Sequence, residues 1–148
     1  MYSEHIGDIF NTTADVIGHG VNCMGVMGAG IAKVVRARMP EWYFEEYSRL
    51  CREYDMSGQY TLSFNDRSDT FIANLFTQVT PGPNAEYRLL VSAMTCFIVD
   101  RWDHGAKSIA LPRIGCGIGG LDWNIVKPIL QGFSEFIDIE VWELEGVK

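Results

Sequence analysis

Two glycine-rich segments constrain this chain more than any other feature of its sequence. The first runs from Gly25 to Gly30 and the second from Gly115 to Gly120. Each follows a short apolar run typical of a strand and precedes a pattern typical of a helix. Backbone N–H groups at a helix N-terminus attract anions, and glycine lets the backbone approach a ligand closely. The segments therefore indicate two phosphate-sized sites, although tight strand-to-helix turns would use the same glycines.

Strand-like and helix-like patterns alternate along the chain. Apolar periodicity predicts strands over 15–22, 59–64, 70–76, 108–112 and 139–144. It predicts helices over 30–39, after Pro40, over 84–104 with Asn84 as the N-cap, and after Asp122. This alternation favours a layered α/β domain with a largely parallel central sheet. Ligands of such sheets bind at the carboxyl ends of the strands, where both glycine segments should meet.

Size and charge limit the classes of function. The 148 residues fit a single domain over 1–148, and the net charge of −7 argues against broad binding to a nucleic-acid backbone. The longest near-apolar run is shorter than the eighteen or so residues of a membrane helix, and the N-terminus lacks the pattern of a secretory signal. The four cysteines show neither a C-x-x-C pair nor a zinc-like spacing. We therefore expect a cytoplasmic protein with free thiols and no metal.

Five polar side chains lie at or near the ends of the predicted strands. Asn22 offers a donor and an acceptor to a sugar hydroxyl, or satisfies the backbone of its own turn. Asp8 either caps a turn or contacts an exocyclic amine. His19 lies within a strand, where histidine is more often a hydrogen-bonded core group than a catalyst. Thr77 should reach the rim of the site, and Cys116 is more often a packing residue than a nucleophile, although nearby N–H groups would lower its pKa.

Three segments, in order along the chain, resemble the signatures of macro domains. They are 7–9, 19–32 and 111–123. The resemblance implies a three-layer α/β/α fold with a mixed, mostly parallel sheet and with ADP-ribose bound in a cleft above it. It also implies that Asp8 reads the adenine amino group, that Asn22 contacts the distal ribose and that His19 lies near the reacting bond. The ADP-ribose-binding residues that it implies are Asp8, Ile9, Asn22, Gly28, Ala29, Gly30, Ile31, Thr77, Ile114, Gly115, Cys116, Gly117 and Ile118.

Two positions depart from the pattern of related enzymes. The chain is most similar to the subgroup of ADP-ribose 1″-phosphate phosphatases, terminal ADP-ribose glutamate hydrolases and DNA ADP-ribose hydrolase antitoxins. Hydrolases of this subgroup that attack through lysine carry it where this chain has Gln78, and glutamine is not an amine nucleophile. The glutamate hydrolases carry an aspartate where this chain has Gly119. Both departures argue against a lysine-dependent reaction.

The leading hypothesis is therefore hydrolysis of the terminal phosphate of ADP-ribose 1″-phosphate. The loop N–H groups would stabilise developing charge, while the catalytic residues His19 and Asn22 would position water or transfer a proton. We expect no cofactor or metal, and a monomer whose partners are ADP-ribose, its 1″-phosphate or ADP-ribosylated macromolecules. One alternative is a non-catalytic ADP-ribose reader or sponge. The other is an ADP-ribosyl hydrolase that acts on protein or DNA through activated water.

Overall fold

The computed structural model describes residues 1–145, and its centre is a six-stranded sheet with the order β1-β6-β5-β2-β4-β3. Strand β3 is antiparallel to its neighbour β4, and the other strand pairs are parallel. The mixed, mostly parallel sheet expected from the sequence is thereby confirmed. Its strands are β1 (Tyr2–Ile6), β2 (Val16–Val21), β3 (Tyr60–Asn65), β4 (Thr70–Phe76), β5 (Ser108–Leu111) and β6 (Asp138–Glu143).

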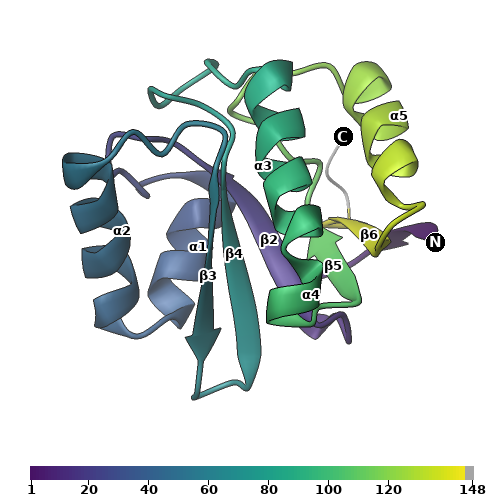
Figure 1. Ribbon diagram of the computed structural model, residues 1–148, viewed down its shortest axis with the longest axis horizontal. Helices are drawn as coiled ribbons and strands as arrows, with labels where there is room; N and C mark the ends of the chain where they lie inside the picture. The colour runs from purple at the N-terminus through teal and green to yellow at the C-terminus, as the bar shows by residue number, and fades with distance from the viewer. Residues whose placement is uncertain (146–148) are drawn as a thin grey trace.

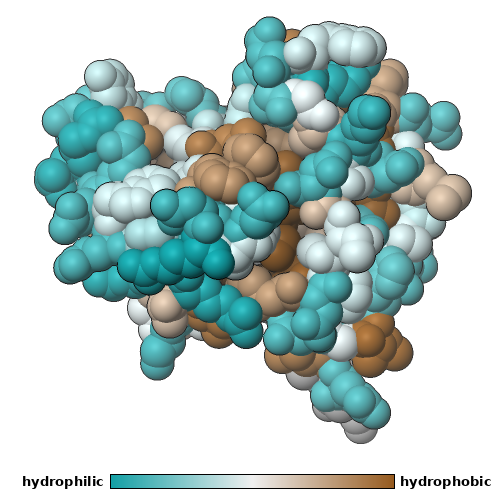
Figure 2. Space-filling view, turned by 90° about the horizontal axis from the view of Figure 1, so that it is seen from below, coloured by the Kyte–Doolittle hydropathy of each residue, from teal (hydrophilic) through white to brown (hydrophobic). Residues whose placement is uncertain are grey.

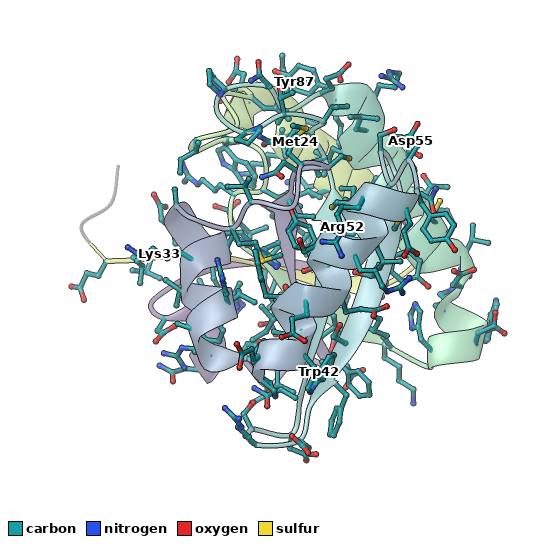
Figure 3. The ribbon with its side chains drawn as sticks, turned by 90° about the vertical axis from the view of Figure 1, so that its left-hand side faces the viewer. Met24, Lys33, Trp42, Arg52, Asp55 and Tyr87 are labelled. Carbon is teal, nitrogen blue, oxygen red and sulfur yellow. The ribbon has the colours of Figure 1, made fainter. Side chains whose placement is uncertain are left out.

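Helices cover both faces of the sheet and complete three layers (Figure 1). One layer holds α1 (Gly30–Arg38) and α2 (Glu41–Glu53), together with the short 3-10 helix η1 (Ile9–Asn11). The other holds α3 (Tyr87–Val99), α4 (Arg101–His104) and α5 (Trp123–Phe133). Figure 3 looks onto α1 and α2 from outside, with Lys33 on α1 and Trp42 and Arg52 on α2.

The central strand β2 sends alternate side chains into the two cores. Val16 packs in the core beneath α3 and α5, while Ile17 packs in the core beneath α1 and α2. This period of two is that of a strand buried on both faces. Gly18 lies close to neighbouring side chains: a Cβ there would lie 2.8 Å from Cδ2 of Leu111, whose side chain would have to shift.

The helix predicted over 84–104 is divided and begins later than expected. Its N-cap is Glu86 instead of Asn84, because residues just before it are extended and held by neighbouring loops: the N–H of Ala85 donates to Gly119 O, and that of Glu86 to Thr77 O. Asn84 instead donates from Nδ2 to Pro81 O. The helix is interrupted at Asp100, whose carboxylate accepts a hydrogen bond from the Tyr60 hydroxyl at 2.7 Å.

The carboxyl ends of the parallel strands gather at the upper edge of the sheet in Figure 1. Loops that follow β1, β2, β4, β5 and β6 meet there, as the rule for open α/β sheets requires. Figure 2 shows the molecule from below, where hydrophobic side chains occupy the middle of the face and hydrophilic ones surround them. Among residues 1–145 there is no helix long and apolar enough to cross a membrane. The upper edge, where these loops meet, is therefore the part of the fold expected to hold a ligand site.

Candidate functional site

A cleft of about 920 Å3 lies along the carboxyl ends of the strands. It is lined by the loop after β1, both glycine-rich segments, the end of β4 and the end of β6. The cleft therefore runs across the sheet from β1 and β6 at one end to β2 and β4 at the other. Every residue that the resemblance assigned to ADP-ribose binding lines it: Asp8, Ile9, Asn22, Gly28, Ala29, Gly30, Ile31, Thr77, Ile114, Gly115, Cys116, Gly117 and Ile118.

Charged and aromatic side chains line the end of the cleft beside β1 and β6. We call it the base end, because the resemblance to macro domains implies that Asp8 there reads the adenine amino group. Asp8 caps η1, with Oδ1 accepting from the N–H of Phe10 at 3.0 Å, while Oδ2 lies 3.6 Å from the Arg38 guanidinium. The same guanidinium stacks 4.0 Å above the Phe10 ring. Asp8 is thus a turn cap, as one of its two interpretations requires, and its carboxylate also lies beside the cleft; contact with an exocyclic amine stays a prediction.

The first glycine-rich segment delivers the N-terminus of α1 to the middle of the cleft. Helix α1 begins at Gly30, which has a φ of +59°, and its N-cap Ala29 has no side chain that could accept from the first N–H groups. These N–H groups carry the positive end of the helix dipole. A helix of nine residues that starts without a side-chain cap beside an open cleft is suited to receive an anionic oxygen.

The second glycine-rich segment lies directly against the first. A Cβ at Gly30 would come within 3.1 Å of Cδ1 of Ile118, so the Ile118 side chain reaches from the second segment to the start of α1. Gly115 has a φ of +76°, and its carbonyl accepts from the N–H of Leu121 at 2.8 Å, which closes the loop. Burial raises the pKa of the Cys116 thiol to about 11, so it is protonated at neutral pH. Cys116 therefore contributes backbone and shape to this loop, and not a thiolate.

Neutral side chains line the opposite end beside β2 and β4. We call it the ribose end, because the same resemblance implies that Asn22 there contacts the distal ribose. Asn22 holds its own loop: Nδ2 donates to Val26 O at 2.7 Å, and Oδ1 accepts from the N–H of Met24 at 3.0 Å. From α2, the Tyr47 hydroxyl donates to Asn22 O at 2.7 Å. Asn22 thus faces the cleft with its polar atoms engaged, which is the turn-forming interpretation of this residue.

The two departures from related enzymes have a structural explanation. Gln78 braces the following loop, with Nε2 donating to Thr80 O at 2.8 Å and to Gly82 O at 3.0 Å. Gly119 is enclosed: a Cβ there would lie 2.7 Å from Gly115 O and 2.8 Å from Cβ of Ala85. A side chain at position 119 would need the backbone of the loop to move. The loops at the ribose end therefore depend on the hydrogen bonds of the Gln78 side chain and on the absence of a side chain at Gly119.

Thr77 carries a hydroxyl that the fold leaves without a partner. Its Oγ1 is buried, lies at the edge of the cleft and makes no hydrogen bond within the described residues. A Cβ at Gly20 would lie 2.7 Å from this oxygen, so glycine keeps the space beside the hydroxyl open. A buried unsatisfied hydroxyl costs free energy in the unliganded protein.

His19 is not brought to the cleft. Its side chain is fully buried beneath α2, where Nε2 donates to Asn74 Oδ1 at 2.9 Å and lies 3.1 Å from the Tyr43 hydroxyl. Burial lowers the pKa of the imidazole to about 4, against a smaller opposite effect of the bond with Asn74. A neutral core histidine results. This buried position differs from the one expected for a catalytic His19 beside the reacting bond, and it agrees with the core interpretation of this residue.

Sequence reasoning missed several residues that line the cleft. Arg38 and Phe10 form the charged stack at the base end, and Arg113 pairs with Glu143 at 3.1 Å further along it. Phe10 lies two residues after Asp8 in the sequence, so the prediction for Asp8 could have included Phe10 as a neighbour. Arg38 lies eight residues after Gly30 on an outward face of α1, and only the position of η1 makes that face part of the cleft.

The fold and the cleft together define an α/β domain that presents two glycine-rich loops along one cleft at the edge of its sheet. The model of the Macro domain family matches residues 19–130. The chain belongs to the Macro domain family.

Proteins of similar sequence cover most of the chain. An uncharacterized 17.5 kDa protein of Enterobacteria phage T4 is 32% identical over 139 residues, 86% of each chain. A DNA ADP-ribosyl glycohydrolase of Mycobacterium tuberculosis is 28% identical across 95% of this chain, which spans 41% of that protein's length. An ADP-ribose 1″-phosphate phosphatase of Candida albicans is 28% identical, covering 80% of this chain and 81% of the relative.

Solved structures agree with the fold. The macrodomain of Mycobacterium tuberculosis DarG is 26% identical, with a TM-score of 0.85 over 96% of this chain and 97% of that one. Thermosipho africanus DarTG in complex with ADP-ribose is also 26% identical, with a TM-score of 0.82 over 96% of this chain and 41% of that one. The three-layer architecture expected from the sequence is confirmed.

Proposed function

We propose that this protein binds ADP-ribose in the cleft and hydrolyses a bond at its distal ribose. The observation that carries the proposal is that the uncapped start of α1 and the Gly115–Ile118 loop line the same cleft, with the Ile118 side chain next to Gly30. Two adjacent rows of backbone N–H groups match two linked phosphates. Asp8 at the base end and the ribose end beyond the loops then correspond to the two outer parts of the ligand.

The leading substrate is ADP-ribose 1″-phosphate. Gln78, where related hydrolases carry a lysine nucleophile, instead braces a loop, and Cys116 is a protonated thiol. A phosphate monoester is suited to such a site, because its hydrolysis needs stabilisation of charge on the phosphoryl oxygens and an attacking water. Backbone N–H groups of the glycine-rich segments would provide the stabilisation. The second N–H of Asn22 Nδ2, which makes no hydrogen bond within the described residues, would position the ribose or the water.

The second candidate is release of ADP-ribose from modified DNA by activated water. It is favoured by the relatives named as DNA ADP-ribosyl glycohydrolases, which match 95% of this chain. The net charge of −7 opposes broad DNA binding. Lys33, Arg36 and Arg38 are exposed on α1 beside the cleft and supply a local basic surface.

Three measurements on one preparation test the proposal. Calorimetry gives the affinity for ADP-ribose, a phosphate assay follows ADP-ribose 1″-phosphate, and chromatography follows release of ADP-ribose from a modified single-stranded oligonucleotide. We expect saturable binding of ADP-ribose and phosphate release. Release from DNA with no phosphate release would replace the leading substrate by the second candidate. Binding with neither product would define a reader, and an absence of binding would refute the whole proposal.

A matched pair of variants separates this site from a contaminating activity. Ile118 is 55% exposed at the cleft and Ile125 is 47% exposed on α5, outside the cleft lining. Ile118→Glu places a negative charge against the expected diphosphate and should lower the affinity at least tenfold. Ile125→Glu changes the same residue type to the same charge and should leave binding and turnover unchanged.

A further inference from the structure

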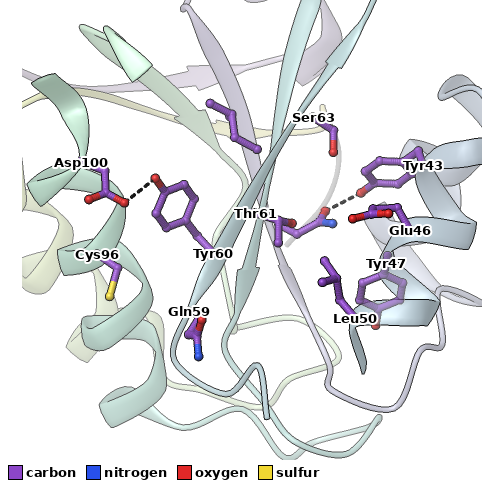
Figure 4. A pocket seen from close by; sticks show the side chains of 12 residues that line it. Tyr43, Glu46, Tyr47, Leu50, Gln59, Tyr60, Thr61, Ser63, Cys96 and Asp100 are labelled. Atoms are coloured by element: carbon purple, nitrogen blue, oxygen red, sulfur yellow. Dashed lines mark hydrogen bonds between the residues drawn. The ribbon is translucent and has the colours of Figure 1, made fainter. Parts of the chain in front are cut away.

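A second groove lies at the opposite edge of the molecule from β1, along strand β3. It has a volume of about 570 Å3 and passes around the free edge of β3 between α2 and α3 (Figure 4). Tyr43, Glu46 and Leu50 line it from α2, whereas Cys96 and Asp100 line it from α3 and its end. The groove shares no lining residue with the cleft at the carboxyl ends of the strands.

The floor of this groove is a strand edge with free backbone groups. β3 is the last strand of the sheet and pairs with β4 on one side. The N–H of Phe76 donates to Gln59 O, so in this antiparallel ladder the alternate residues Tyr60, Leu62 and Phe64 turn their N–H and C=O groups away from β4. Such groups are satisfied in full only by another strand or by water.

The sequence of β3 lacks the features that usually protect a strand edge. The run Tyr60–Asn65 contains no charged residue and no proline, and it is rich in residues with high β-propensity. The other edge strand, β1, contains Glu4, which pairs with Lys127 at 2.8 Å. β1 is therefore guarded by charge, and β3 is open to pairing.

We propose that β3 adds an extended segment of a partner polypeptide, one with basic side chains, as a seventh strand. Helices α2 and α3 flank the edge on both faces of the sheet, so the groove admits a single extended segment more easily than the edge of a second layered domain. Its lining contains two carboxylates, Glu46 and Asp100, and no lysine or arginine. Main-chain hydrogen bonds would supply affinity, and the two carboxylates would select lysine or arginine on the added strand.

The two carboxylates lie on opposite faces of the strand edge. Asp100 is held by the Tyr60 hydroxyl at 2.7 Å, which fixes its position on the α3 side. Glu46 lies on α2 with its side chain half exposed and pairs with Arg49 at 2.9 Å, while Arg49 also pairs with Glu53. Side chains of an added strand alternate between these faces, so adjacent basic residues would reach one carboxylate each.

The test uses two labelled ten-residue peptides of alternating valine and threonine, with two adjacent central lysines in one and two glutamates in the other. Fluorescence polarisation should show the lysine peptide binding at least tenfold more tightly. Glu46→Lys should remove or reverse this preference, whereas Glu45→Lys, an equal change of charge one residue away and outside the groove, should preserve it. Both variants should retain the wild-type affinity for ADP-ribose or, if that ligand does not bind, the wild-type unfolding midpoint.

Hydrogen exchange identifies strand addition directly. The lysine peptide should slow amide exchange at Tyr60, Leu62 and Phe64 and leave the amides already paired with β4 unchanged. Leu62→Pro removes an outward donor and should abolish binding; should that variant unfold, the exchange pattern and Glu46→Lys still decide the question. Absence of binding, binding without this alternate protection, or a dimer of the wild-type chain formed through β3 would each overturn the proposal.

Discussion

The two ends of the cleft are built from different chemistry. At the base end, Asp8, Arg38 and Phe10 form a charged stack with side chains that remain partly exposed. At the ribose end, Asn22 and Gln78 are neutral, and both are hydrogen-bonded to the loops that carry them. The base end thus offers charged side chains to a ligand, whereas the ribose end offers backbone and shape.

This difference bears on how the site would act. Charged side chains discriminate between ligands, because leaving a buried charge or donor unpaired is costly. A rigid backbone cradle stabilises charge that develops during a reaction without reorganising. We therefore expect selection of the nucleotide at the base end and stabilisation of the reacting group at the ribose end. Four predictions test this division, beginning with the largest effect.

Gly119→Asp should disrupt the ribose end most severely. The new Cβ would lie 2.7 Å from Gly115 O and 2.8 Å from Cβ of Ala85, so the loop that carries Gly115 must move. We expect a loss of about 2–3 kcal/mol in the free energy of unfolding, together with loss of ADP-ribose binding. Urea titration and calorimetry measure the two effects. Gly117→Ala is the control for stability, because its Cβ would meet nothing within 4 Å; an equal loss in both variants would contradict the packing argument.

The buried network beneath the ribose end should make stability depend on pH. The pKa of His19 falls from 6.5 to about 4 on folding, so between these values the unfolded chain binds more protons than the folded one. The stability contributed by neutral His19 is complete above pH 6.5 and is lost as the pH falls toward 4, by up to about 3 kcal/mol. Urea midpoints between pH 7.5 and 4.5 measure it. His19→Gln should flatten this dependence, whereas His5→Gln should retain it; an unchanged slope in His19→Gln would assign the effect to other groups.

Substitution of two tyrosines on α2 separates effects on the buried His19 network from effects on the cleft. Tyr43 and Tyr47 are both buried and lie one turn apart, but the Tyr43 hydroxyl bonds Asn74, whereas that of Tyr47 bonds Asn22. Each change to phenylalanine should cost about 1–2 kcal/mol of stability, because a buried partner loses its hydrogen bond. Only Tyr47→Phe should also weaken ADP-ribose binding, by a factor of about three to ten. Equal affinities in the two variants would show that Asn22 does not depend on its support from α2.

The fold was predictable because its signals are local and repeated. Strand periodicity, the caps at Asp122 and Pro40 and the glycine-rich turns each act within a few residues, and together they define the alternation of strands and helices. The start of α3 was not predictable: residues 84–86 resemble a helix start, but hydrogen bonds to Thr77 O and Gly119 O keep them extended. Those acceptors come from distant parts of the chain, which periodicity does not detect.

The location of the candidate site was predictable from the sequence, whereas the role of each residue in it was less so. Glycine-rich segments after strands placed the cleft, and all thirteen residues assigned to ADP-ribose binding line it. Roles depend on side-chain partners: His19 lies in a strand whose alternation directs it beneath α2, and Asn22 is occupied by its own loop. The core position of His19 agrees with the interpretation that its place within a strand already favoured. The support of Asn22 by Tyr47 does not follow from sequence spacing, because it depends on how α2 packs against the sheet.

The smallest effect concerns the Thr77 hydroxyl at the ribose end. Because Oγ1 is buried and lacks a partner in the unliganded protein, Thr77→Val should leave the free energy of unfolding unchanged or raise it by up to about 1 kcal/mol. If bound ADP-ribose supplies the missing partner, the same change lowers the affinity about threefold or more, as calorimetry would show, and Thr77→Ser retains it. A valine variant that is stabilised and binds ADP-ribose as well as the wild type would show that this hydroxyl serves no ligand. The ribose end would then bind its ligand through backbone groups alone. This would increase its difference from the base end, which offers charged side chains.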